Sequence, residues 1–330
     1  MYYPILIKSI DFPIFKAISE ASETLNVHSY VIGGYVRDHM IGRKSKDVDI
    51  VTDGNGIELA NLVAQKLKIK KVNIFKTFGT AMFMWDDWQI EFVGARKESY
   101  TSHSRNPIVS VGTIEEDQDR RDFTINAMAI SLQKADYGFL IDPFNGSADL
   151  EKGIIRTPLD PDITFSDDPL RMMRAVRFST QLGFEILPET LDSIKKNAHR
   201  IEIVTMERII EELNKIVMSN IPSKGFYLLD ATGLLGLIFP TFVKLKGAEF
   251  VEGKGHKDNF RHTLEVLDRI APNTHNLWLR WSALLHDIGK PSTKRFDQQL
   301  GWTFHGHEFR GMKMVPAIFN QLRLPMNEKM

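Results

Sequence analysis

The chain has 330 residues, in which 42 Lys and Arg residues balance 42 Asp and Glu residues, so that its formal net charge is zero. This balance excludes a globally basic nucleic-acid-binding protein, and any RNA contact must come from local basic patches. The absence of cysteine excludes disulfides and thiolate metal sites, and 43% hydrophobic residues suffice for buried cores in two or three domains.

The first residues carry a proline and an early lysine, without the basic and then apolar layout of a signal peptide. No apolar run approaches the ~20 residues that span a bilayer. The sequence therefore predicts a soluble cytoplasmic protein that contacts no membrane, and it leaves the oligomeric state open.

A mixed α/β domain is predicted over residues 1–155. Its expected strands are short runs of β-branched and aromatic residues bounded by turn residues, at 29–32, 47–51, 80–85 and 88–93. Its expected helices lie at 35–41 and 56–67. The polar segment 97–119 has no periodicity, and we predict that it is a functional loop or disordered.

The rest of the chain has helical periodicity. Predicted helices follow one another at 168–180, 188–198, 206–218, 225–232, 260–270 and 277–286. We divide this part into a helical neck over 156–246 and a further helical domain over 247–330.

The strongest functional pattern joins a glycine-rich turn to a pair of carboxylates, Gly33-Gly34-x-x-Arg37-Asp38 and then Asp47-x-Asp49. Residues two apart in a strand point to the same face, so Asp47 and Asp49 can hold Mg²⁺ together with substrate phosphates. Gly33 and Gly34 allow backbone N–H groups to approach a phosphate, and Arg37 adds positive charge. Taken singly, each feature is better explained as a turn or a solvated strand, but their order and spacing favour a nucleotide site.

These residues, with Gly42-Arg43 between them, resemble the first motif of class II tRNA nucleotidyltransferases and bacterial poly(A) polymerases. Later segments resemble, in order, the family's ribose-recognition motif, its head-to-neck segment and its nucleotide-selecting motif, at 120–129, 142–150 and 167–178. The resemblance implies a polymerase-β-like α/β nucleotidyltransferase head with a mixed sheet, followed by an all-α neck that selects the nucleotide and binds RNA.

Two metal ions ~3.5–4 Å apart can activate an attacking hydroxyl and stabilise departing pyrophosphate. We predict that Asp47 and Asp49 hold two Mg²⁺ ions, as the resemblance also implies. Glu91, on the second strand of the hairpin, is the predicted third carboxylate. An ordinary exposed strand residue explains Glu91 equally well, because alternation alone places some polar side chain there.

A ribose site is predicted around Arg121, Asp122 and Asn126. We expect these residues on a helix, with Asp122 and Asn126 on one face at positions i and i+4. Their side chains can bind ribose hydroxyls and so favour a ribonucleotide. A structural network of ion pairs is the alternative.

Asp168 and Arg171 are predicted to lie one turn apart on a helix capped by residues 166–167. A carboxylate beside a guanidinium matches the Watson–Crick edges of cytosine and adenine, whereas uracil and guanine present the wrong donor pattern. An ordinary Asp–Arg helix pair is the alternative. At three-residue spacing the same helix face continues with Arg174 and Arg177. These arginines are further nucleotide-binding candidates, and an ordinary solvated helix face is the alternative.

His262, His286 and Asp287 resemble the HD phosphohydrolase family, and 305–308 resembles its continuation. Imidazoles and a carboxylate can hold a divalent metal for phosphoester hydrolysis, although a core histidine is the alternative for His262. An HD site normally ends with an aspartate on a later helix, whereas no aspartate follows Asp297. We therefore expect a sequence truncated within a partial HD-type helical domain, with an incomplete metal site and no hydrolysis.

The leading interpretation is template-independent addition of CMP and AMP, from CTP and ATP, to the 3′ end of tRNA with release of pyrophosphate. A poly(A) polymerase and a specialised CC-adding or A-adding enzyme are close alternatives, because they share the head motifs. An HD phosphohydrolase with a vestigial head is an alternative of another class, and it predicts that Asp47→Ala is harmless and His286→Ala is not. A catalytically silent RNA-binding protein is disfavoured by the intact pair Asp47 and Asp49.

Overall fold

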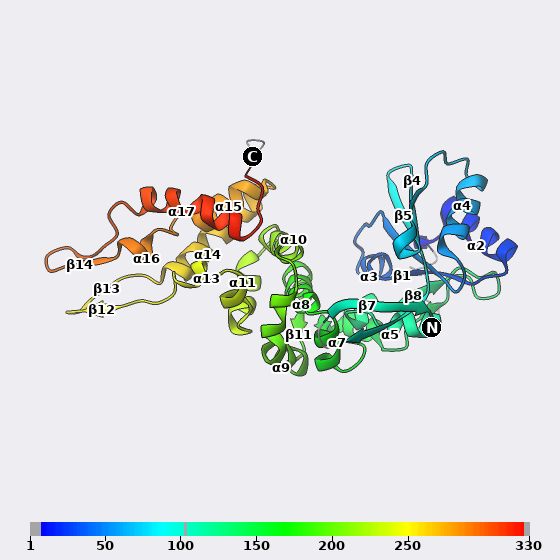
Figure 1. Ribbon diagram of the computed structural model, residues 1–330, viewed down its shortest axis with the longest axis horizontal. Helices are drawn as coiled ribbons and strands as arrows, with labels where there is room; N and C mark the ends of the chain where they lie inside the picture. Colours follow the sequence, from blue (N-terminus) through cyan, green and yellow to red (C-terminus); the bar gives the residue numbers. More distant parts are fainter. Residues whose placement is uncertain (1–7, 102–103, 327–330) are drawn as a thin grey trace. The chain divides into compact units, whose positions relative to one another are not determined.

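The computed structural model describes residues 8–101 and 104–326 (Figure 1). The chain forms two compact units, Met1–Asp160 and Pro161–Met330. The predicted division into three domains, over 1–155, 156–246 and 247–330, stays a prediction, since the two units mark a single division. In the part of the chain that the structure describes, no helix has the length and apolar character needed to cross a membrane.

Unit 1 is built on a seven-stranded sheet with the strand order β3-β4-β5-β2-β1-β8-β9. The strands are β1 (Ser29–Ile32), β2 (Asp47–Thr52), β3 (Asn73–Phe75), β4 (Thr80–Trp85), β5 (Trp88–Gly94), β8 (Ala129–Ser131) and β9 (Leu140–Ile141). Strands β2 and β5 are parallel, whereas the other neighbouring pairs with a described register are antiparallel. The predicted mixed sheet is therefore confirmed.

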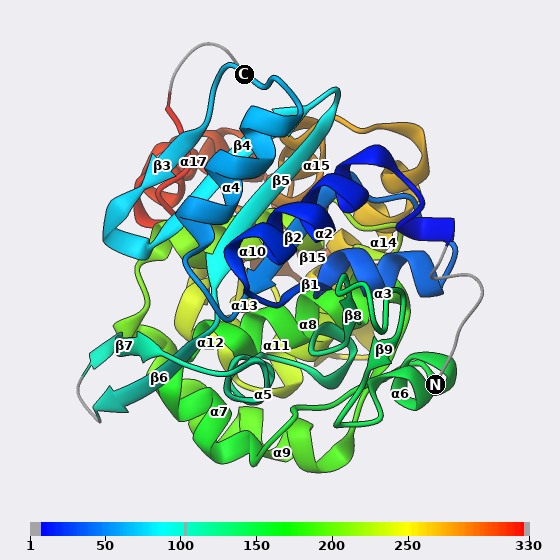
Figure 2. The ribbon, with the colours of Figure 1, turned by 90° about the vertical axis from the view of Figure 1, so that its right-hand side faces the viewer.

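One face of the sheet is covered by helices α2 (Pro13–Leu25) and α4 (Gly56–Lys66), as Figure 2 shows. Alternate residues of the central strands point into this core, among them Val48, Ile50, Ile90 and Phe92. The same alternation directs the intervening side chains to the other face. That face carries the polar residues singled out in the sequence.

The remaining elements of unit 1 are α3 (Gly34–Met40), η1 (Lys76–Phe78), β6 (Arg96–Thr101), β7 (Ser104–Val111), α5 (Ile114–Asp119), η2 (Thr124–Asn126), α6 (Gly146–Lys152) and β10 (Ile154–Ile155). Strands β6 and β7 pair antiparallel. The prediction that 97–119 is a loop or disordered is therefore wrong for the described residues, which form strands and a helix, and a functional role of this segment stays a prediction. Helix α5 even begins with a capping box, in which Thr113 and Glu116 exchange side-chain and backbone hydrogen bonds, a signature readable in the sequence.

The predicted helix through Arg121, Asp122 and Asn126 is also wrong. Helix α5 ends at Asp119, the chain bends, and a short 3-10 helix follows at Thr124–Asn126. Asp122 and Asn126 nevertheless meet, because Asn126 Nδ2 donates a hydrogen bond to Asp122 Oδ1 at 3.0 Å. The bend and the 3-10 helix bring the two residues together in place of an α-helix.

Unit 2 is built mainly of helices. They are α7 (Pro161–Asp167), α8 (Leu170–Leu182), α9 (Pro188–Asn197), η3 (Ala198–Ile203), α10 (Met206–Val217), α11 (Pro222–Ala231), α12 (Leu234–Ile238), α13 (Pro240–Val243), α14 (Asn259–Ile270), η4 (Ala271–Asn273), α15 (Leu277–Leu285), α16 (Lys290–Thr293) and α17 (His307–Gln321). Its strands are β11 (Glu185–Ile186), β12 (Phe250–Val251), β13 (Lys254–Gly255), β14 (Arg295–Asp297) and β15 (Gly301–Thr303). The predicted helical character of this half is confirmed.

A buried arginine connects three helices of unit 2, α10, α14 and α15. Arg280 of α15 donates from Nη1 to the carbonyls of Val217 and Ser219 at 2.8 and 2.7 Å, and from Nη2 to the carbonyl of Ala271 at 2.6 Å. These carbonyls lie at the ends of α10 and α14, where helices leave acceptors without intrahelical partners. Arg280 therefore fastens α15 to the ends of α10 and α14.

We predict that Arg280→Met lowers the free energy of unfolding by about 3 kcal/mol, because several buried carbonyls lose their donor. Chemical denaturation monitored by tryptophan fluorescence measures the change. The control is Arg261→Met, since Arg261 lies on the exposed side of α14 and pairs only with Glu265 at the surface in the described contacts, at 3.1 Å. Equal stability of the two variants would contradict this role of Arg280.

Candidate active site

The two aspartates of the sequence pattern lie on the open face of β2. Val48 and Ile50 are buried between the sheet and its helices, whereas Asp47 and Asp49 are exposed on the opposite side. The predicted common face of these carboxylates is therefore what the structure shows. Their role as metal ligands stays a prediction.

Glu91 lies directly beside this pair. In the parallel register of β2 and β5, Asp49 is opposite Glu91 and Asp47 is opposite Gln89. Partial burial and then the neighbouring charge of Asp49 raise the pKa of the Glu91 carboxyl, while Arg96 acts in the opposite direction. Three carboxylates thus share one face of the sheet, close enough for Asp49 and Glu91 to affect each other's charge.

On the other side of β2, Gly33 follows β1 in a left-handed conformation, with φ of 81°. A Cβ atom at this position would lie 2.9 Å from Nη1 of Arg121, 3.6 Å from Oδ2 of Asp49 and 3.7 Å from the carbonyl oxygen of Asn126. Only glycine fits both this backbone conformation and this close approach. Gly33 therefore marks the point where the predicted phosphate, metal and ribose motifs meet.

Arg37 of α3 is nearly buried and makes specific contacts. Its Nε donates to Asp38 Oδ1 at 2.9 Å, and its Nη1 donates to Asn126 Oδ1 at 2.6 Å. Asn126 in turn donates to Asp122, whose Oδ1 also accepts from the backbone N–H of Phe123 at 2.9 Å. Arg37, Asn126 and Asp122 therefore form one hydrogen-bonded chain that links the glycine-rich motif to the predicted ribose motif.

Asp117 is a residue that the sequence analysis missed. It is fully buried in α5 and accepts hydrogen bonds from Nε of Arg120 at 3.0 Å and from Nη2 of Arg121 at 3.1 Å. Burial alone would raise the pKa of this carboxyl, but the charges of Arg121 and Arg120 outweigh burial and lower it. The available signal was the spacing of Asp117 and Arg121, an acidic and a basic residue four positions apart in the sequence, although α5 ends at Asp119 before it reaches Arg121.

The second group of predicted residues lies at the start of α8. Residues 166–167 belong to the end of α7, so their prediction as an N-cap is wrong. The N-cap of α8 is Pro169, and Asp168 lies one residue before it. Oδ1 of Asp168 accepts a hydrogen bond from the backbone N–H of Leu170 at 3.2 Å. Arg171 follows in the first turn of α8, and its backbone N–H donates to the carbonyl of Asp168 at 3.0 Å.

Neighbouring charges surround this group. Nη2 of Arg208 in α10 lies 3.9 Å from Oδ2 of Asp168. Nε of Arg177 lies 2.7 Å from Oε2 of the buried Glu212, and the guanidinium carbon of Arg177 lies 4.0 Å from the ring centre of Phe178. Arg174 lies over the same ring at 5.4 Å. The contacts of Arg177 join α8 to α10, and a nucleotide-binding role for Arg177 stays a prediction.

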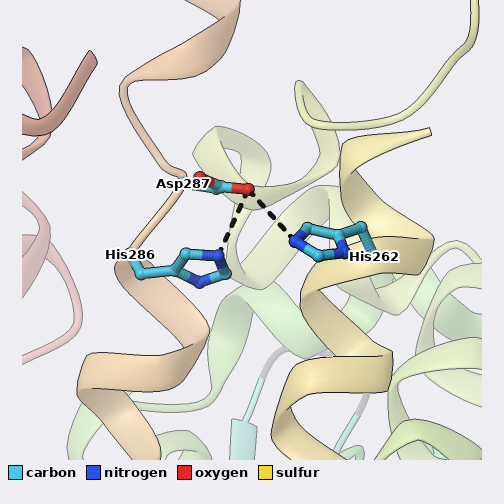
Figure 3. Close-up of side chains that lie close together, drawn as sticks. All are labelled: His262, His286 and Asp287. Atoms are coloured by element: carbon cyan, nitrogen blue, oxygen red, sulfur yellow. Dashed lines mark ion pairs between the residues drawn. The ribbon is translucent and has the colours of Figure 1, made fainter. Parts of the chain in front are cut away.

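His262, His286 and Asp287 come together in unit 2 (Figure 3). Nε2 of His286 and Nε2 of His262 lie 3.2 and 3.8 Å from Oδ2 of Asp287. Within the described residues, this is the one group of three such ligands whose atoms all lie within 4.8 Å of one another. Imidazole nitrogens with a carboxylate oxygen suit a divalent transition metal.

Two further side chains approach the nearly buried Asp287. Nζ of Lys290 lies 2.7 Å from Oδ2, and Nε2 of His307 lies 3.4 Å from Oδ1. Burial opposes ionisation of Asp287, but hydrogen bonds from His286 and Lys290 lower its pKa to about 2. The hydrogen bond to Asp287 also raises the pKa of His286. His307 therefore belongs to this cluster, as the resemblance of segment 305–308 suggested.

We predict that Asp117→Asn lowers the free energy of unfolding by about 3 kcal/mol near neutral pH, because two guanidinium groups lose a buried carboxylate. A lowered pKa in the folded state stabilises the protein above the ordinary pKa of 3.8, and this contribution disappears as the pH falls through the folded value. The difference between wild type and variant should therefore shrink in acid.

Chemical denaturation at about pH 7 and at about pH 3 measures both effects. The matched control is Asp119→Asn, at an exposed position of the same helix. A difference for Asp117→Asn that is independent of pH would contradict the proposed ion pairs.

Three family descriptions match the sequence in chain order. Residues 29–156 match "Poly A polymerase head domain", residues 183–245 match "Probable RNA and SrmB- binding site of polymerase A", and residues 259–329 match "HD domain". The first match contains β2, β5 and the network around Gly33. The third contains the cluster around Asp287.

Similar proteins extend the comparison over most of the chain. The "Multifunctional CCA protein" of Nitrosococcus oceani is 35% identical over 305 residues, which cover 90% of this chain and 70% of the relative. The "CC-adding tRNA nucleotidyltransferase" of Halalkalibacterium halodurans is 29% identical over 328 residues, covering 94% of this chain and 80% of the relative.

A solved structure of a CCA-adding enzyme in complex with CTP has a similar fold. Its TM-score is 0.71 at 28% identity, and the match covers 98% of this chain and 68% of that chain. The agreement includes both the α/β head and the helical half.

Proposed function

The chain belongs to the family of tRNA nucleotidyltransferases and poly(A) polymerases, and from this membership we infer that it adds C, C and A to the 3′ end of tRNA, using CTP and ATP. One structural observation carries the inference. Asp47 and Asp49 project from one face of β2, with Glu91 beside them on β5 and Gly33, Arg37 and Arg121 on the other side. The reaction joins the RNA 3′-hydroxyl to the α-phosphate and releases pyrophosphate.

The donor set fits magnesium. Carboxylate oxygens on an exposed face are the ligands that Mg²⁺ prefers, and the ion takes its remaining oxygens from water and substrate phosphates. We propose that Asp47 and Asp49 hold two such ions, with Glu91 as the third carboxylate. When bound, the ions supply charge stabilisation of the attacking hydroxyl and of the departing pyrophosphate.

The protein's own groups bind the triphosphate from the side of β1. Gly33 offers a backbone that a phosphate can approach closely, since no Cβ intervenes. Arg37 and Arg121 supply positive charge at the same place, and the hydrogen bond from Arg37 to Asn126 fixes the guanidinium. Asp122 and Asn126 are nearly buried, so we propose that they act on the ribose through the few atoms that remain accessible.

We propose that Asp168 and Arg171 select the base. The carboxylate of Asp168 is held just before α8 by the hydrogen bond that it accepts from the backbone N–H of Leu170, and Arg208 lies beside it. A fixed acceptor next to a donor can distinguish cytosine and adenine from uracil and guanine. Arg174 and Arg177 would support this pair from the next turns of the helix, with Arg177 fixed through Glu212.

The cluster around Asp287 favours a second candidate function in unit 2. We propose that His262, His286 and Asp287 hold one divalent transition metal, since they supply part of the donor set that HD phosphohydrolases use. A groove of about 670 Å³ adjoins His286 and is lined by apolar side chains such as Trp278, Leu279 and Met312. Phosphoester hydrolysis would require Lys290 to leave Asp287, to which it now donates at 2.7 Å.

A cytoplasmic location of the protein also stays a proposal.

Nucleotide addition is tested with Mg²⁺, labelled CTP and ATP, and tRNA that ends at the discriminator base. We predict that wild type incorporates two C and one A, and that Asp47→Ala lowers the rate by about a thousandfold or more, because a metal ligand of the reaction is lost. Long A tails would indicate a poly(A) polymerase, and arrest after two C would indicate a specialised CC-adding enzyme.

His286→Ala is the matched control for this experiment. It should leave nucleotide addition unchanged while it removes metal binding in unit 2, measured by equilibrium dialysis with Mn²⁺ or Co²⁺. Loss of nucleotide addition in His286→Ala together with an active Asp47→Ala would reverse the assignment in favour of the phosphohydrolase.

Selection by Asp168 is tested by measuring incorporation of each of the four nucleotides. We predict that Asp168→Ala reduces the preference for CTP over UTP by about tenfold to a hundredfold, because the acceptor for the cytosine amino group is lost. Arg208→Gln is expected to have a smaller effect, since Arg208 contacts only the carboxylate. An unchanged preference in Asp168→Ala would contradict base reading by this residue.

A further inference from the structure

The open face of the sheet continues past the carboxylates toward β4 and β3, where it changes character. In the antiparallel register of β5 and β4, Met84 is opposite Gln89 and Met82 is opposite Glu91. Met84 is 51% exposed, and Phe75 of the edge strand β3 is 46% exposed on the same face. An uncharged, partly apolar surface therefore adjoins the acidic one.

Two arginines of the site, Arg37 and Arg121, lie on the opposite side of the carboxylates, whereas Arg96 follows β5 and acts on Glu91. Strand β1 is the other neighbour of β2, with Ile32 opposite Asp49, and the next residue along β1 is Gly33. Arg121 lies against Gly33, and Arg37 lies one turn into α3. The two sides of the carboxylate row thus differ in their side chains, with Arg37 and Arg121 toward β1 and the uncharged Met82 and Met84 toward β4.

The geometry of phosphoryl transfer decides what occupies the uncharged side. The attacking and leaving oxygens lie roughly in line through the reacting phosphorus. The RNA 3′ end therefore approaches the phosphorus on the side opposite to the departing pyrophosphate. The arginines near β1 suit the triphosphate. The RNA end must then reach the carboxylates from the side of β5 and β4.

We propose that Met84 and Gln89, with Met82 behind them, form the seat of the terminal nucleoside of the RNA primer. This inference rests on the proposed nucleotidyltransferase function and deepens it. Neighbouring strands are ~4.8 Å apart, so Met84 lies roughly 10 Å across the sheet from Asp47, about the span of one nucleoside. The polarisable Met84 side chain contacts the base or ribose, and the Gln89 amide supplies a donor and an acceptor.

Lysines at the edge of this surface, next to β3, can bind the phosphates of the primer. Lys70 and Lys71 precede the edge strand β3, Lys76 follows it, and all three are exposed. Phosphates leading away from the terminal nucleoside would pass from the acidic row across the uncharged surface to these lysines. This is a local basic patch of the kind that a chain with zero net charge needs to bind RNA.

Steady-state kinetics of the full chain test the proposal with tRNA that ends at the discriminator base. We predict that Met84→Ala raises KM for this tRNA about three- to tenfold, because half-buried apolar contact with the primer is lost, while KM for CTP stays within about twofold. Met84→Leu, which keeps the apolar volume, should restore most of the loss. The matched control is Ile74→Ala, a similarly exposed position on the opposite face of the same sheet edge.

Three outcomes would contradict the proposed binding of the terminal nucleoside at Met84 and Gln89. They are an unchanged KM for tRNA in Met84→Ala, a parallel rise in KM for CTP, and an equal effect of Ile74→Ala. Thermal melting of each variant identifies any loss that reflects unfolding, in which case Gln89→Ala, at an exposed position, is measured in the same way. Failure of wild type to incorporate any nucleotide would refute the proposed function itself, and the two failures are therefore distinguishable.

Discussion

The parallel pairing of β2 with β5 is the contact on which the candidate active site depends. It places Asp49 beside Glu91 and Asp47 beside Gln89, and it leaves the intervening Val48 and Ile90 to pack against the helices. A shift of β2 by one residue would turn Asp47 and Asp49 into the core, and a shift of β5 would do the same to Glu91. Burying a charged carboxylate in the core is unfavourable, so the alternation of hydrophobic and polar residues strongly specifies the register. The same residues that stabilise the sheet therefore hold the carboxylates in place.

How much of this could be read from the sequence depends on the distance along the chain. Asp47 and Asp49 are two residues apart in one strand, so their common face follows from local geometry. That Glu91 lies next to them depends on strand order, which the hairpin pattern alone does not specify. The link from Arg37 to Asn126 joins residues 89 positions apart, and only the folded chain reveals it. Asp122 and Asn126 illustrate the opposite case, because they meet as expected although the helix predicted to join them is absent from that described segment.

Several candidates turned out to have structural partners that a pattern of single residues cannot show. Arg177 lies in the predicted nucleotide stripe, yet its guanidinium meets the buried Glu212. Arg121 likewise approaches Gly33, and the Arg121 guanidinium also donates a hydrogen bond to the buried carboxylate of Asp117. Such partners do not compete with a functional role, since a guanidinium fixed by a buried carboxylate loses less conformational entropy when it binds a phosphate. The buried ion pairs thus explain how flexible side chains become positioned ones.

Zero net charge has a physical consequence for a protein that handles RNA and triphosphates. Opposite charges must be separated locally, because a uniform field that attracted one polyanion would also hold the reaction's anionic product. On the sheet of unit 1 this separation runs across the strands, from the arginines near β1, over the carboxylates of β2 and β5, to the uncharged surface of β4 and the lysines around β3. Each zone suits a different part of the reacting complex: triphosphate, metal ions, terminal nucleoside and primer backbone. The order of the strands across the sheet therefore matches the spatial order that we propose for the triphosphate, the metal ions and the RNA primer.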